Sequence, residues 1–502
     1  MKQNTLFIAA LWILLGTSCT KDLEELNVNP NQPTKVEPGP LFTALELRQA
    51  GTSVARRSNV GFGMMMVQQT ATTKIDDLEG DKYLPSESAA LLFNEEYAVP
   101  VSNMAVLIDM LKKDPEKVNL YAAARIWKVM QMHRLTDAYG DVPYSEAGQG
   151  FLQQIYKPVY DKQSDIYAHM LTELEQATTS FVPGKVTFGN ADIIYKGAIE
   201  QWKRLGNSLM LRLGLRLIKV DPAASKQWVL KAIQGGVMQS NSDICYMRHT
   251  GPQQELANPI AFDFQKFEIL KVGDIKIGKT FMDYLKGTND PRLAVYSSLS
   301  NGDNSPALQK GLPNGYNATT IGSTPGGADL TTYSTFNVST ILPLSAPTFF
   351  LTYAETELML AEAAARQWTS DVAATHYRAA VEASMDQQKL YGRTISGSDV
   401  SAYLSTGNPF PIAGNMEQQL KSINEQYWVV TFLNGWESYA NWRRTGIPQL
   451  TPVNYPGNVS GGTIPRRFTF PRNEYSANGT NVKQANAQQG PDTYTTRVWW
   501  DK

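Results

Sequence analysis

The chain has 502 residues, a formal net charge of −1 at neutral pH and a charged fraction of 19%. A balance so close to neutral gives no reason to expect a nucleic acid or an anionic membrane surface as the partner. The length suits one to three domains and allows a large buried core. The function therefore has to be sought in local patterns of residues.

The beginning of the chain is typical of a secretory signal peptide over residues 1–18. One charge, Lys2, is followed by an apolar run from Leu6 to Leu15 and by small residues directly before Cys19. This order predicts cleavage before Cys19 and a lipid on its thiol; an ordinary cleaved signal with a chance cysteine is the alternative. The apolar run is about half the roughly 20 residues of a membrane-spanning helix, so the expected anchor is the lipid alone. Only Cys245 remains as a second cysteine, and no intramolecular disulfide is expected.

Residues 19–40 are predicted to be a lipidated terminus and tether, because the stretch from Asn27 to Pro40 is rich in Asn and Pro and cannot form a packed core. Beyond it we expect a single domain over residues 41–502. Two insertions in this domain, at about 245–347 and 448–489, are rich in Gly, Asn, Ser, Thr and Pro. Long loops of this kind usually carry function.

Helical periodicity marks three regions, near residues 120–177, 197–234 and 353–385. In the first region, Trp127 lies on an apolar face and the pattern ends at Gly140. Each region is long enough for two helices. The sequence therefore predicts three helix pairs.

The plainest amphipathic stripe belongs to the second region, where apolar residues recur at steps of three and four. Its members are Ala198, Trp202, Leu205, Leu209, Leu213 and Leu217. Arg212 and Arg216 fall on other faces of this helix. Asp221 and Pro222 end the pattern, and a partner helix is expected to follow.

The third region, from Tyr353 to Met385, predicts two alanine-rich helices with a break near Trp368 to Asp371. Ala361, Tyr377 and Ala380 match the spacing of a tetratricopeptide helix pair, in which small side chains let two helices approach closely. We therefore predict a mainly α fold in which tetratricopeptide-like helix pairs form a scaffold, together with a long irregular loop-rich lobe.

Several strings resemble hallmark segments of the SusD/RagB family of nutrient-binding outer-membrane lipoproteins. They are LTDAYGDVPYSEA at Leu135–Ala147, KPVYDKQSDIY at Lys157–Tyr167, NDPRL at Asn289–Leu293, LTYAETELMLAEAAAR at Leu351–Arg366 and FLNGWESYANWRRTGIP at Phe432–Pro448. With other strings in the same order, they make nearly the whole mature chain similar to the SusD-like subgroup. The Lys and acidic residues directly after Cys19 also resemble the export signal of Bacteroidetes lipoproteins that face the cell exterior.

The resemblance implies a receptor that captures a nutrient in polysaccharide utilisation. A SusD-like lipoprotein sits as a lid over a SusC-like TonB-dependent β-barrel transporter in the outer membrane and takes an oligosaccharide or a peptide. Two alternatives stay open. The chain could be an exported hydrolase that acts on the same class of nutrient, or a structural surface lipoprotein without a ligand.

No constellation of residues predicts catalysis, a metal site or a cofactor. The four histidines are far apart in sequence, and none has a second histidine at the i+4 spacing of a helical zinc site. They are His133, His169, His249 and His376, and each is interpreted as a surface or helix-face residue. A Gly-rich phosphate loop and a Gly-x-Ser-x-Gly turn are also missing from the sequence. We therefore expect a binding protein and no enzyme.

Two arginine pairs, Arg443–Arg444 and Arg466–Arg467, could grip a carboxylate or an acidic sugar through bidentate hydrogen bonds. Internal ion pairs are the favoured interpretation, because Arg is the residue best suited to buried pairs. Asp137, Asp141 and Arg134 are likewise interpreted as residues that satisfy polar groups at the end of the first helix.

Aromatic residues in loops are the candidates for ligand contact, because a glycan receptor stacks sugar faces on exposed rings. The candidates are Tyr83, Tyr246, Tyr316, Tyr333 and Phe336. Trp127 and Trp202 lie on apolar helical stripes and are assigned to the core. The alternative for each candidate is that its ring pins the loop onto the scaffold.

Overall fold

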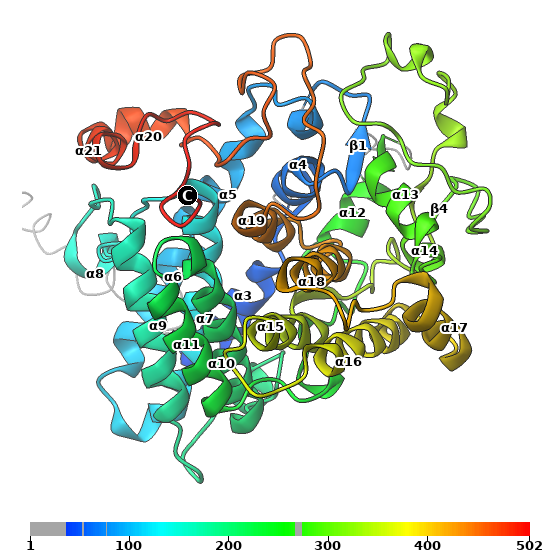
Figure 1. The fold of residues 1–502 in the computed structure, drawn as a ribbon. Coiled ribbons are helices and arrows are strands. Elements are labelled where there is room, and N and C mark those ends of the chain that lie inside the picture. The colour runs from blue at the N-terminus through cyan, green and yellow to red at the C-terminus, as the bar shows by residue number, and fades with distance from the viewer. Residues whose placement is uncertain (1–36, 53–54, 77, 267–273) are drawn as a thin grey trace, which may run out of the picture.

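The computed structural model describes residues 37–52, 55–76, 78–266 and 274–502, and Figure 1 shows a mainly helical molecule. The predicted signal peptide, Cys19 and nearly all of the predicted tether lie outside the described residues. Within the part of the chain that the structure describes, no helix is both long and apolar enough to cross a membrane.

In the described residues, we take nine helices as the scaffold, and the other helices surround or connect them. The scaffold helices are α6 (Pro100–Leu111), α7 (Val118–Tyr139), α9 (Gln163–Thr179), α10 (Ile199–Arg216), α11 (Pro222–Gly235), α15 (Tyr353–Ala365), α16 (Ala373–Asp386), α18 (Met416–Val430) and α19 (Gly435–Thr445). The others are α3 (Pro38–Gln49), α4 (Met64–Met66), α5 (Leu91–Ala98), α8 (Gly150–Gln153), α12 (Pro259–Lys266), α13 (Lys279–Gly287), α14 (Leu293–Tyr296), α17 (Gly397–Ala402), α20 (Arg472–Ala477) and α21 (Gly479–Gln489).

Within the described residues, short strands form three antiparallel pairs, β1 with β3, β2 with β6 and β4 with β5. Their bounds are Thr70–Thr72 for β1, Cys245–Met247 for β2, Ile275–Ile277 for β3, Ser297–Ser298 for β4, Thr335–Phe336 for β5 and Thr348–Leu351 for β6. Cys245 in β2 is buried as a free thiol.

The three predicted helix pairs are confirmed. Helix α7 packs against α9, α10 against α11, and α15 against α16. Helix α7 ends at the predicted place, because Gly140 follows Tyr139 with a φ of +84°, a conformation that glycine adopts at little cost. The break expected near Trp368 to Asp371 separates α15 from α16, and both Ala361 and Ala380 are buried.

Helix α10 is buried on more than its apolar stripe. Trp202 and Leu209 are buried as predicted, but Arg212 and Arg216 are buried too, although the stripe left them on other faces. The reason is that α7 and α15 also pack against α10, so its polar side is covered. A guanidinium in such a place needs a carboxylate partner, because an unpaired buried charge is strongly destabilising.

The lobe formed by residues 245–347 contains α12, α13, α14 and short strands, joined by long turns. Strand β3 of the lobe pairs with β1, with Ile277 opposite Thr70, and so connects the lobe to the N-terminal part of the described chain. A small apolar cluster separate from the main core lies here. Its buried members are Ala71, Leu312, Ile321 and Tyr333.

Candidate functional site

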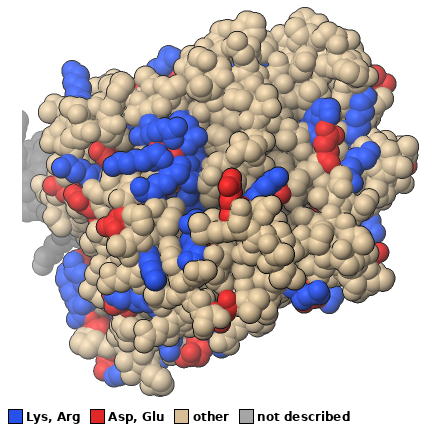
Figure 2. Space-filling model, viewed as in Figure 1, with Lys and Arg blue, Asp and Glu red and all other residues tan. Residues whose placement is uncertain are grey.

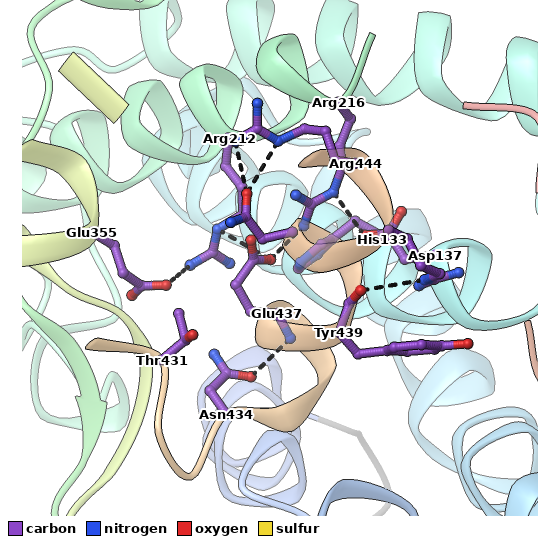
Figure 3. A network of polar contacts seen from close by, with 12 residues as sticks. His133, Asp137, Arg212, Arg216, Glu355, Thr431, Asn434, Glu437, Tyr439 and Arg444 are labelled. Carbon is purple, nitrogen blue, oxygen red and sulfur yellow. Dashed lines mark hydrogen bonds and ion pairs between the residues drawn. The ribbon is translucent and has the colours of Figure 1, made fainter. Parts of the chain in front are cut away.

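A buried ion-pair network joins α10, α15 and α19, as Figure 3 shows. Arg212 donates to Glu355 at 3.0 Å, and Arg216 donates to Glu437 at 2.6 Å. Burial acts to raise the pKa of Glu437, but the guanidiniums of Arg216 and Arg212 outweigh it and lower that pKa to about 2. The carboxylate stays ionised at neutral pH, and the network holds the helices together.

The two predicted arginine pairs lie inside the protein. Their ion-pair partners are Glu362 for Arg444, Asp501 for Arg466 and Asp492 for Arg467. Arg443 differs, because its guanidinium lies 4.2 Å from the ring centre of Tyr439 and 4.8 Å from that of Trp500. These contacts confirm the internal role that the sequence favours.

The acidic residues near the end of α7 also have internal partners. Asp137 accepts a hydrogen bond from the indole of Trp500 at 2.9 Å, and Asp141 accepts one from the backbone N–H of Gln163, also at 2.9 Å. Arg134 donates to the backbone oxygen of Gln49 at 3.2 Å. The region therefore ties four segments of the chain together.

Two of the four histidines are not at the surface. His133 and His249 are buried, and burial lowers the pKa of each to about 4. His133 is inside because α7 is packed against α6, α9, α10 and α19. His169 is exposed and His376 half-buried. In the described part of the chain, no cluster of His, Cys, Asp and Glu is arranged to hold a metal ion.

An open cleft of about 580 Å³ lies between two loops, residues 313–323 and residues 451–456. In Figure 1 these are the yellow-green and orange loops at the top of the molecule, and in Figure 2 this upper region shows few charged side chains. The cleft is lined by Gln68, Lys279, Thr280, Pro313, Asn314, Gly315, Tyr316, Thr320, Ser323, Thr451, Pro452, Val453, Asn454, Tyr455 and Pro456. We consider this cleft the candidate ligand site.

The two loops touch each other at two points. The side-chain amide of Asn317 donates to the hydroxyl of Tyr455 at 2.6 Å. Gly315 has a φ of +84°, and a Cβ added there would lie 2.3 Å from Cγ1 of Val453. Only a residue without a side chain allows so close an approach. The contact fixes the width of the cleft at this end.

Three consecutive residues hold both loops in place from below. A carboxylate oxygen of Asp81 accepts from the N–H of Gly315 at 3.3 Å, and the hydroxyl of Tyr83 accepts from the N–H of Val453, also at 3.3 Å. Between them, the ammonium of Lys82 donates to Asp81 at 2.8 Å. Burial raises the pKa of Asp81, and Lys82 opposes this. The segment therefore positions both walls.

A glutamine completes this support. Gln68 donates to the backbone oxygen of Thr451 at 2.6 Å, and its carbonyl accepts from the hydroxyl of Thr280, also at 2.6 Å. It thus links the second loop to the first turn of α13. Lys279 in the same turn forms a solvent-exposed ion pair with Asp283.

The structure brings two of the five aromatic candidates to the cleft. Tyr316 lines it and is partly exposed, whereas Tyr83 is 2% exposed and supports the cleft from below. Tyr333 is buried in the small cluster behind the first loop, where its hydroxyl donates to the backbone oxygen of Gly327 at 3.2 Å. Tyr333 therefore fits the alternative interpretation, in which the ring pins its loop onto the scaffold.

The other two candidates lie elsewhere. Phe336 is fully buried between Phe264 and Phe432. Tyr246 is partly exposed and packs against Phe349. Neither lines the cleft.

The second loop of the cleft, residues 451–456, was not predicted from the sequence as part of the site. Tyr455 and Asn454 lie in the loop-rich insertion 448–489, between Pro452 and Pro456. An aromatic ring between two prolines in a long loop was a usable signal, because proline limits the conformations of the loop.

The lining suits a neutral polar ligand. Tyr316 and Tyr455 offer partly exposed rings from opposite loops, and the side-chain amides of Asn314 and Asn454 supply both donors and acceptors. Lys279 is the only charged residue among the described residues of the lining. Such a mixture of flat apolar faces and carboxamides matches the two kinds of surface that a sugar presents.

Known proteins resemble this chain over most of its length. Residues 30–471 match a family model described as starch-binding and associating with the outer membrane. A solved structure described as a chitin-binding protein shares 31% identity, with a TM-score of 0.82 over 93% of this chain and 100% of the other. No curated protein matches the chain.

Two further structures are similar. A chitin-binding SusD homolog from Flavobacterium johnsoniae has 26% identity and a TM-score of 0.78, covering 93% of this chain and 98% of that one. A SusD-like protein from Bacteroidetes has 25% identity and a TM-score of 0.81, covering 93% of this chain and 100% of the other.

Proposed function

Because this chain belongs to the SusD-like family, which associates with the outer membrane and binds glycans, we propose that it captures an oligosaccharide at the cell surface. It then delivers the sugar to a SusC-like TonB-dependent β-barrel transporter. The tetratricopeptide-like scaffold positions the cleft, and the transporter provides the path of the sugar through the membrane.

The anchor in this proposal is a lipid on Cys19, at the start of the predicted tether of residues 19–40. The proposed location is the outer membrane, with the protein facing the cell exterior.

The observation that carries the proposal is that Tyr316 and Tyr455 line the cleft from opposite loops, with Lys279 as the one charged residue in the described lining. Sugar rings have apolar faces that stack on aromatic rings, and their hydroxyls match carboxamide groups. A peptide ligand would bring charged termini or side chains, for which the lining offers only Lys279, already paired with Asp283. The cleft therefore favours a neutral glycan over a peptide.

Within neutral glycans, we take a chitin oligosaccharide as the leading ligand. Two of the similar structures are described as chitin-binding. The N-acetyl group of such a sugar has an amide that can pair with Asn314 or Asn454, and a methyl group that can pack on Val453 or Pro452. A starch oligosaccharide lacks this group and is the natural comparison.

Binding without hydrolysis is also part of the proposal. A glycosidase needs two carboxyl groups on either side of the scissile bond. The described residues that line the cleft include no Asp, Glu or His. The described lining thus offers no pair of carboxyl groups for glycoside hydrolysis, which favours a receptor over the alternative of an exported hydrolase.

Calorimetry on the full chain in detergent tests the proposal, with chitopentaose, maltopentaose and tetra-alanine as probes. We expect chitopentaose to bind and to be recovered intact by mass spectrometry. Tyr316→Ala should weaken binding, whereas Tyr156→Ala, a 77% exposed tyrosine away from the cleft, should not. Release of shorter sugars would indicate a hydrolase, and binding of none of the three probes would overturn the proposed capture.

A further inference from the structure

A second surface feature lies on the helical side of the molecule. The segment 148–156, called here the aromatic knuckle, contains α8 and exposes Phe151 by 84% and Tyr156 by 77%. It is held firmly, because Gly148 has a φ of +72° and a Cβ there would lie 2.6 Å from the backbone oxygen of Val101 in α6. Large apolar side chains held out in this way are typical of interaction sites.

A pocket of about 90 Å³ adjoins the knuckle, between α6, α7 and residues 144–153. Its apolar lining comes from Val101, Met104, Ala105, Ile108, Met132, Ala147 and Leu152. Lys128 also lines it, with its ammonium 4.9 Å from the ring centre of Tyr144. Lys112 lines it as well, so the pocket combines an apolar wall with two amines.

The charge of Lys128 has no direct counter-ion among the described residues. Glu173, the carboxylate whose charge acts on Lys128, is bound through both oxygens by Arg125, at 2.7 and 3.2 Å. Asp109 lines the same pocket, but Lys112 and Lys113 hold it at 2.8 and 2.9 Å. The pocket therefore carries a net positive charge that a carboxylate from outside would complement.

We propose that the aromatic knuckle and this pocket dock a protein segment that carries a carboxylate between apolar side chains. The apolar side chains cover Phe151 and Tyr156, and the carboxylate reaches Lys128. The partner is an extracellular loop of the barrel transporter, since such barrels have long loops on that side. This identity of the partner rests on the proposed function.

The position of the knuckle is compatible with ligand capture. Figure 1 shows α8 at the left edge of the molecule, away from the two loops of the cleft at the top. A partner seated on the knuckle would therefore leave the cleft open. Docking and sugar binding can then be measured separately.

Site-specific photo-crosslinking tests the docking. The full chain, with p-benzoylphenylalanine at position 151, is irradiated in cells that also carry the barrel, and mass spectrometry identifies the attached peptide. The control carries the same group at position 372, where Val372 is 61% exposed in another part of the chain. We expect an adduct with a barrel loop that contains Asp or Glu, at about ten times the yield of the control.

A second set of variants tests the charge. Lys128→Met should lower the crosslinking yield about tenfold, the effect of losing about 1.4 kcal/mol, and Lys128→Arg should retain most of it. An adduct with lipid only, with a second copy of the chain, or at the yield of the control would overturn the docking. Chitopentaose binding by the same variants separates the two proposals, because unchanged binding without crosslinking leaves the proposed capture standing.

Discussion

The side-chain amide of Asn317 donates a hydrogen bond of 2.6 Å to the hydroxyl of Tyr455, and this bond joins the two loops that form the cleft. Asn317 belongs to the first loop and Tyr455 to the second. The bond fixes the hydroxyl end of the Tyr455 ring and leaves its face partly exposed. A ring held in this way loses little conformational freedom when a sugar stacks on it.

Replacing Tyr455 should separate the effect of the ring from that of its hydroxyl. Tyr455→Phe keeps the ring and removes one hydrogen bond, worth about 1 kcal/mol net, so chitopentaose affinity should fall about fivefold. Tyr455→Ala also removes the stacking surface, and the affinity should fall about 100-fold. Calorimetry measures both. Equal losses for the two variants would contradict stacking of the sugar on the ring, because the lost hydrogen bond with Asn317 would then account for the whole effect.

The helix pairs were predictable from sequence because their signals are local. The stripe through Trp202 and Leu209 and the stop at Gly140 each lie within one helix, where the spacing of apolar residues decides the burial. The burial of Arg212 was not predictable in this way. It depends on Glu355 in α15, 143 positions away in the sequence.

Only part of the cleft was predictable from the sequence, because the cleft also depends on contacts between distant parts of the chain. Its residues come from four separate segments that include Gln68, Lys279, Tyr316 and Tyr455, and no local pattern connects them. Tyr316 and Tyr333 lie in the same loop-rich stretch, yet one lines the cleft and the other is buried. What separates them is the packing of Tyr333 against the small cluster that includes Ala71, a contact between distant parts of the chain.

The approach of the two loops at Gly315 predicts a position-specific loss of stability. Gly315→Ala adds a methyl group 2.3 Å from Cγ1 of Val453, and the loops must separate. Gly302→Ala is the matched control, because its φ is also positive, at +91°, but the nearest atom is 3.7 Å away. We expect Gly315→Ala to lower the free energy of unfolding in urea by about 1–3 kcal/mol more than the control does. It should also weaken chitopentaose binding, and equal losses for the two variants would argue against a tight contact.

Mild acid should destabilise the protein through two buried histidines. Burial lowers the pKa of His133 and His249 to about 4, below the ordinary value of 6.5. The unfolded chain therefore binds a proton below pH 6.5 that the folded protein does not. Stability should be highest above pH 6.5 and fall as the pH drops toward 4, by about 3 kcal/mol for each histidine. Histidine NMR shifts measure the pKa of each ring directly, and titration of either ring near pH 6.5 in the folded protein would contradict the prediction.

Stronger acid should remove a second contribution, from the glutamates of the ion-pair network. In the folded protein, neighbouring arginines overcome burial and lower the pKa of Glu437 and Glu362 to about 2, below the ordinary 4.5. A carboxyl group of this kind contributes its full stability above pH 4.5 and loses it as the pH falls toward 2. Glu437→Gln removes the nearer of the two carboxylates that pair with Arg216 and should cost about 3–5 kcal/mol at pH 6. In urea unfolding, the difference in free energy of unfolding between Glu437→Gln and the natural protein should narrow steadily between pH 4.5 and 2. The control is Glu116→Gln, because the Glu116 side chain is 74% exposed, and this variant should have nearly the stability of the natural protein at any pH. A gap between Glu437→Gln and the natural protein that stays constant down to pH 2 would mean that Glu437 carries no charge in the folded state.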